Sequence, residues 1–118
     1  MKQEKKEANF RVMAARARAV ADSQRSGPGG RIVIAVIGRD RPGIMAGVTA
    51  ILAQRGANIL DVSQTIMSEL FTMIMLVDLK GIHVTFAALK KELETHGGNE
   101  GLSIIVQHED IFRAMHRV

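Results

Sequence analysis

Two short runs of this chain are apolar at nearly every position, and they limit the folds that it can adopt. The first run is Ile32–Ile37, and the second is Phe71–Val77. A strand that is apolar on both sides needs a cover on each face of its sheet, so it belongs in the middle of that sheet. We therefore expect these runs to be two central strands, with half-apolar elements around them.

The remaining segments after residue 30 show strand or helix periodicity. Two alternate apolar with polar residues, as edge strands do, and two carry apolar residues at helical spacing. Gly56 and Gly97-Gly98 follow the helical segments and predict their ends. In chain order we predict a strand at Ile32–Ile37, a helix at Gly43–Arg55, strands at Asn58–Ser68 and Phe71–Leu79 joined by a turn near Ser68-Glu69, a helix at Thr85–His96, a strand at Leu102–His108 and a short helix at Asp110–Arg117.

Periodicity also predicts which side chains face the core. The helical segments should bury Ile44, Val48, Ile51 and Leu52 in the first case and Phe86, Leu89 and Leu93 in the second. In the strand Asn58–Ser68, alternation predicts one face with Leu60, Val62 and Ile66 and an opposite face with Asp61, Ser63 and Thr65.

The element order βαββαβ favours an α+β fold, the ferredoxin-like sandwich. This fold has an antiparallel four-stranded sheet of order 4-1-3-2 with both helices on one face, here followed by the short C-terminal helix. Its central strands are the first and third, which are the two doubly apolar runs. Their second apolar face then needs a cover, and a second subunit, the C-terminal helix and the N-terminal segment are candidates. We expect a homodimer.

The chain divides into a basic extension, residues 1–30, and a domain, residues 31–118. The extension carries the whole net charge of +4, and it ends in Ser26-Gly27-Pro28-Gly29-Gly30, which has the composition of a flexible linker. It is either a basic arm for nucleic acid, a membrane surface or a protein partner, or a non-essential extension. The domain has equal numbers of basic and acidic residues, so its charge gives no reason to bind nucleic acid.

Composition excludes several kinds of site. The chain has no cysteine, so it has neither disulfides nor zinc–cysteine sites, and a cytoplasmic location is expected. Aromatic residues make up 3% of the chain, which argues against base stacking. No apolar run is long enough to span a bilayer, and no signal peptide is recognisable.

The turn Gly38–Gly47 links the first strand to the first helix and is the best candidate for a site. Pro42 suits a first helical position, and Asp40 can accept hydrogen bonds from free N–H groups there. These N–H groups, with Arg39 and Arg41 beside them, favour an anion such as a carboxylate or phosphate. The turn lacks the Lys-Ser/Thr of a Walker motif and the glycine pattern of a dinucleotide fingerprint. A capped turn with two solvated arginines is the alternative.

With these motifs in place, residues 31–118 resemble an ACT domain. The resemblance lies in Val36-Ile37-Gly38-Arg39-Asp40-Arg41-Pro42-Gly43-Ile44, Gly56-Ala57-Asn58-Ile59 and Asp61-Val62-Ser63-Gln64-Thr65. The tail Ile111–Met115 is similar to that of the small single-domain ACT proteins of bacteria and archaea, a group without an established activity. That group is similar to the ACT modules of the glycine cleavage system's transcriptional regulator and of formyltetrahydrofolate deformylase.

The resemblance implies a regulatory module that binds an amino acid or a similar small effector, often at an interface between two domains. It implies no catalytic residue, metal or cofactor, and it implies that the module acts through a protein partner. The residues that match the family's contact positions are Asp40, Arg41, Pro42, Gly43, Ile44, Asn58, Ser63 and Gln64. Asn58 can equally be a turn-forming residue, and Gln64 a solvated side chain on an edge strand.

The three alternative functions are an enzyme, a nucleic-acid-binding domain and a structural subunit. Acylphosphatases share the topology, but they need a glycine-rich loop with an arginine, and here the loop ends in Pro42-Gly43-Ile44. RNA-recognition folds need exposed aromatics on the central strands, where only Phe71 is available. The four histidines, His83, His96, His108 and His116, are too scattered to predict a metal site. A structural subunit that docks a partner through the edge of its second or fourth strand is the third alternative.

Overall fold

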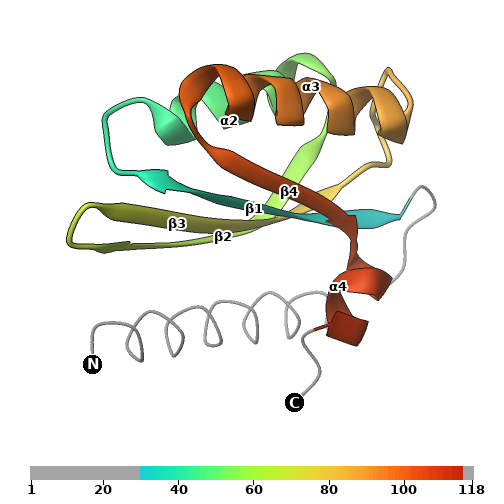
Figure 1. The fold of residues 1–118 in the computed structure, drawn as a ribbon. Coiled ribbons are helices and arrows are strands. Elements are labelled where there is room, and N and C mark those ends of the chain that lie inside the picture. Colours follow the sequence, from blue (N-terminus) through green and yellow to red (C-terminus); the bar gives the residue numbers. More distant parts are fainter. Residues whose placement is uncertain (1–29, 116–118) are drawn as a thin grey trace.

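The computed structural model describes residues 30–115, so most of the predicted extension at residues 1–30 and the end of the chain lie outside the described residues. The fold is the predicted α+β sandwich. Its elements, labelled as in Figure 1, are β1 (Arg31–Arg39), α2 (Ile44–Gln54), β2 (Asn58–Met67), β3 (Leu70–Asp78), α3 (Phe86–Glu100), β4 (Ser103–His108) and α4 (Glu109–Met115).

The sheet has the order β2-β3-β1-β4, which confirms the predicted 4-1-3-2. All three strand pairs are antiparallel, and Ile34 of β1 lies between Met75 of β3 and Val106 of β4. Helices α2 and α3 cover one face, whereas α4 lies beyond the other face, at the end of β4 (Figure 1). The two doubly apolar runs are therefore the central strands, as their pattern predicts.

The main core lies between the sheet and the two long helices. It takes every second side chain of β1 and β3, for example Ile34 and Met75, which are fully buried. From the helices it takes Val48, Leu52, Leu89 and Leu93, as predicted. Because these side chains come from four elements, the core fixes both helices on the sheet and thereby positions the loop between β1 and α2.

A second apolar cluster lies on the opposite face of the central strands. It joins Val33, Ala35, Ile74 and Leu76 to Phe112 of α4. The start of α4 is held by a salt bridge of 3.0 Å between Arg31 Nη2 and Glu109 Oε1. The C-terminal helix therefore contributes to the cover that the sequence requires. A second subunit on this face stays a prediction, and the N-terminal segment lies outside the described residues.

A β-bulge in β2 makes one prediction wrong, the placement of Leu60 on the same face as Val62 and Ile66. The pairing with β3 shifts between Ile59 and Asp61, so Leu60 is inserted without a partner of its own. Alternation fails across such an insertion. Val62 packs against the main core, whereas Leu60 packs against the second cluster on the other face.

The end of α3 is also corrected. This helix continues through Gly97-Gly98 to Glu100, and Gly101 ends it with a left-handed φ of 71°. Gly97 is buried where α3 crosses β4, and a Cβ there would lie 2.9 Å from Ile104 Cγ1 and 3.0 Å from the Leu102 carbonyl oxygen. The glycine thus permits close packing rather than stopping the helix. Gly56, by contrast, does follow the end of α2, with a φ of 79°.

None of the helices within residues 30–115 combines the length and the apolar character needed to cross a bilayer.

Candidate ligand-binding site

The loop between β1 and α2 has a different cap from the predicted one. Gly43, not Asp40, occupies the N-cap of α2, with a left-handed φ of 90°, and no side chain caps the helix. Pro42 consequently precedes the cap instead of standing in the first helical turn. The Asp40 backbone N–H donates to the Glu69 carbonyl over 2.7 Å, which ties the loop to the β2–β3 hairpin. The first N–H groups of α2 are therefore left for a bound anion or for water.

Both arginines of the loop face acidic side chains. Arg39 lies 3.5 Å from Glu69 on the exposed surface. Arg41 Nη2 donates to Glu100 Oε1 over 2.7 Å and to the Glu100 carbonyl over 3.2 Å. The hydrogen bond from Arg41 lowers the pKa of the Glu100 carboxyl below its usual value, and the positive charge of Arg41 acts in the same direction. Arg41 thus links the loop to the C-terminal end of α3.

The other predicted site residues lie elsewhere. Asn58 is exposed at the start of β2, beyond the far end of the 11-residue helix α2. At 1.5 Å per residue this helix separates Asn58 from the loop by roughly 16 Å. Ser63 pairs with Ile74 and belongs to the second face, whereas Gln64 pairs with Met73 on the helix-covered face and is exposed. Within one chain, the loop residues Asp40–Ile44 therefore lie together, whereas Asn58 lies at the opposite end of α2.

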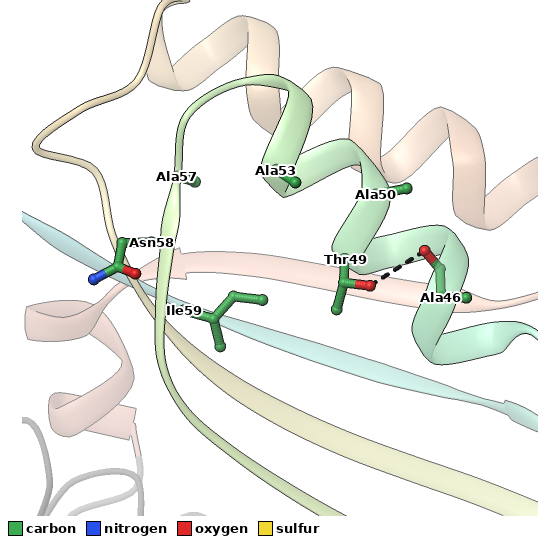
Figure 2. Close-up of a pocket in the computed structure, with 7 residues that line it drawn as sticks. All are labelled: Ala46, Thr49, Ala50, Ala53, Ala57, Asn58 and Ile59. Atoms are coloured by element: carbon green, nitrogen blue, oxygen red, sulfur yellow. Dashed lines mark hydrogen bonds between the residues drawn. The ribbon is translucent and has the colours of Figure 1, made fainter.

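A shallow groove of about 500 Å³ lies between α2 and the start of β2. Its lining is mostly small side chains: Ala46, Thr49, Ala50, Ala53, Ala57, Asn58 and Ile59. In Figure 2 Thr49 and Ile59 face one another across it, whereas the Asn58 amide extends to the other side of β2. The Thr49 hydroxyl donates to backbone carbonyls of its own helix, at 2.9 Å to Met45 and 3.2 Å to Ala46.

Sequence reasoning missed this groove, although a signal was present. Ala46, Thr49, Ala50 and Ala53 recur at helical spacing on the face of α2 opposite the core residues. Such a row of short side chains leaves room beside a helix.

The described histidines lie apart and make local structural contacts. The His83 backbone N–H donates to the Arg55 carbonyl over 3.0 Å. The His96 ring packs over Gly47, where a Cβ would approach Nε2 to 2.9 Å. The rings of His108 and Phe86 have centroids 4.3 Å apart. Within residues 30–115 no three His, Cys, Asp or Glu side chains form a metal-binding group, and the absence of a metal in the whole protein stays a prediction.

The family model described as the ACT domain matches residues 30–107. The chain belongs to the ACT domain family. A UPF0237 protein of Methanocaldococcus jannaschii is 60% identical over 88 residues, which cover 75% of this chain and 98% of that protein. These matches name no catalytic activity.

Solved structures support the same assignment. An ACT domain protein from Streptococcus pneumoniae superposes with a TM-score of 0.61 and 38% identity, over 70% of this chain and 92% of that one. A candidate glycine cleavage system transcriptional repressor superposes with a TM-score of 0.60 and 28% identity, over 66% of this chain and 44% of that one. The structural likeness to a regulator thus covers the ACT fold and less than half of the regulator's chain.

Proposed function

We propose that this ACT domain is a non-catalytic regulatory module that binds an amino acid, or a similar small carboxylate, between two copies of the chain. The observation that carries this proposal is the position of the family's contact residues at opposite ends of α2. One copy offers Asp40–Ile44 at one end and Asn58 at the other, so a small effector cannot touch both groups in one chain. Two copies can bring them together.

The open edge of β2 supports a specific pairing. Within the described sheet this strand pairs only with β3, so no described strand lies along its outer edge, where a strand of another copy can pair. If two β2 strands pair antiparallel across a two-fold axis, the start of one lies beside the end of the other. The hydrogen bond from Asp40 to Glu69 holds the loop near the end of β2. The loop of one copy would then lie close to Asn58 of the other.

The loop provides chemistry for both ends of an amino acid. The uncapped N-terminus of α2 and Arg41 favour a carboxylate. The exposed carboxylate of Asp40, or the amide of Asn58 or Gln64 from the second copy, can meet an ammonium group. Ser63 lies on the second face of the sheet, so we assign it no contact with the effector. The absence of cysteine supports a cytoplasmic location.

Thermal melting of the full chain against the common amino acids and related small acids tests the sensor function. A ligand at about 100 times its dissociation constant adds about 2.7 kcal/mol of stability, which raises the melting temperature by several degrees. We expect one chemical class to stabilise the protein, and Asp40→Ala or Asn58→Ala to abolish the shift. Glu94→Gln, an exposed change on α3, is the matched control. If no compound shifts the melting temperature, the sensor function is wrong.

Mixing the two variants tests the shared site. In a two-fold dimer, an Asp40→Ala copy and an Asn58→Ala copy together form one intact site, because each supplies the part that the other lacks. After unfolding and refolding of an equal mixture, roughly a quarter of the wild-type sites should bind the effector. No recovery would show that both residues do not act across one interface, and a monomer by light scattering would exclude the dimer. A dimer without effector binding would instead favour a structural subunit that joins another sheet through the β2 edge.

A further inference from the structure

In the Arg41–Glu100 pair, the Glu100 carboxylate occupies the arginine of the loop that we propose as the effector site. The contact is short, at 2.7 Å between Arg41 Nη2 and Glu100 Oε1, and it joins residues 59 positions apart. Both side chains are 41% exposed, so a small solute can reach the pair. An ion pair with this exposure is weak, because water screens both charges. It can form and break without unfolding either element.

The same contact links the loop to the start of β4. Glu100 is the last residue of α3, and its carbonyl also accepts from Arg41 over 3.2 Å. Two residues later, the Leu102 backbone N–H donates to the Gly97 carbonyl over 2.7 Å. The Leu102 side chain packs over Gly38, where a Cβ would lie 2.5 Å from Leu102 Cδ2. The end of α3, the start of β4 and the end of β1 thus meet beside the loop.

A separate contact joins α3 directly to α2. The His96 ring, one turn before Glu100, packs over Gly47 in the first half of α2. This packing holds α2 and α3 together when Arg41 moves. A change at Arg41 is therefore confined to the loop and to the end of α3.

We infer that Glu100 is a built-in competitor for the effector, which occupies Arg41 until a carboxylate displaces it and frees the end of α3 from the loop. The inference rests on the proposed function only in that it takes the loop as a carboxylate site. It makes Glu100 a residue that sets the effector's affinity without touching the effector. It also gives the bound state a structural signature, the loss of the contact between the loop and residues 100–102.

Sodium acetate is the probe, read by the backbone amide signals of the full chain in NMR at constant ionic strength. In the wild type, acetate should shift the amides of residues 40–44 and, with the same concentration dependence, those of residues 100–102. Because an exposed ion pair is worth little, Glu100→Gln should bind acetate only about two- to five-fold more tightly. In that variant the response of residues 100–102 should be lost.

Three controls make the test specific. Glu94→Gln, on the same helix, should bind acetate as the wild type does. Acetamide, which has the shape of acetate without its charge, should shift neither chain. Arg41→Gln should remove the acetate response at the loop, both alone and in combination with Glu100→Gln.

The inference is wrong if Glu100→Gln binds acetate equally or less tightly than the wild type, since Glu100 would then be neutral or would position Arg41. It is also wrong if acetate produces no response at the loop in either chain. These outcomes are separate from those of the sensor function. The acetate response should persist in Asn58→Ala, a variant in which the shared effector site is destroyed.

Discussion

Two adjacent glycines near the end of α3 allow a sharp test of the packing argument. Gly97 and Gly98 both lie inside the helix and both have ordinary helical backbone, since neither has a positive φ. Gly97 is buried against β4, whereas a Cβ on Gly98 would meet nothing within 4 Å. Replacing each by alanine therefore gives the same gain in helix propensity at both positions. Only at Gly97 does the added methyl group meet other atoms.

The two substitutions should differ in their effect on stability, because only Gly97→Ala has a packing cost. Glycine costs about 1 kcal/mol relative to alanine inside a helix, so Gly98→Ala should stabilise the protein by up to that amount. Gly97→Ala has the same gain, but its Cβ would lie 3.0 Å from the Leu102 carbonyl oxygen and 2.9 Å from Ile104 Cγ1. Forcing a methyl group into a packed contact costs about 1–3 kcal/mol. The two variants should therefore differ by about 1–3 kcal/mol, since the propensity gain cancels.

Urea denaturation followed by circular dichroism measures this difference, and thermal melting provides a second measure. For a domain of this size, 1 kcal/mol corresponds to about 4–8 °C in melting temperature. We expect Gly98→Ala to melt above the wild type and Gly97→Ala to melt well below Gly98→Ala. If the two variants are equally stable, α3 and β4 do not approach as closely as the structure has them, and the corrected end of α3 loses its explanation.

The Arg55–Glu92 ion pair and the packing of α4 under the sheet allow further predictions. The hydrogen bond from Arg55 lowers the pKa of Glu92 below its usual value of 4.5, so this carboxylate adds stability at neutral pH that is lost as the pH falls through its folded-state pKa. On acidification from about pH 6 to about pH 3, the wild type should lose more stability than Glu92→Gln, and parallel pH profiles would contradict this. Phe112→Ala should cost about 3 kcal/mol in urea denaturation, because it empties a buried site under the sheet, whereas the neighbouring Ile111→Ala should change stability by less than about 0.5 kcal/mol, because Ile111 is 51% exposed. Equal losses for the two variants would mean that α4 is not docked through Phe112.

The topology was predictable because it depends on patterns that average over many residues. The two doubly apolar runs identify β1 and β3 as central, and the helical spacing of Val48, Leu52, Leu89 and Leu93 identifies the faces of α2 and α3. Each pattern requires burial of a whole face, so a single exceptional residue does not change the result. The sheet order then follows from connection rules that are independent of side-chain detail.

The errors occurred where one residue decides the outcome. The bulge at Leu60 reverses the alternation, and no residue type is required at that position. At Gly97 the sequence pattern of a helix end was misleading, because the same residue is needed for close contact with β4. At Gly43 the cap is provided by backbone conformation, so the acidic side chain three residues earlier is not used. These are tertiary effects, which a local pattern does not contain.

The prediction of the candidate site was incomplete for a different reason. The resemblance identified its residues one by one, but it could not say that the 11-residue helix α2 separates Asn58 from the loop in a single chain. That separation changes what a mutation means. If the site is shared, Asp40→Ala and Asn58→Ala damage different parts of the same site in different subunits, so a mixed dimer retains function that neither parent has. Recovery on mixing would therefore establish dimerisation and ligand binding as one property of this ACT domain, because neither alone can produce it.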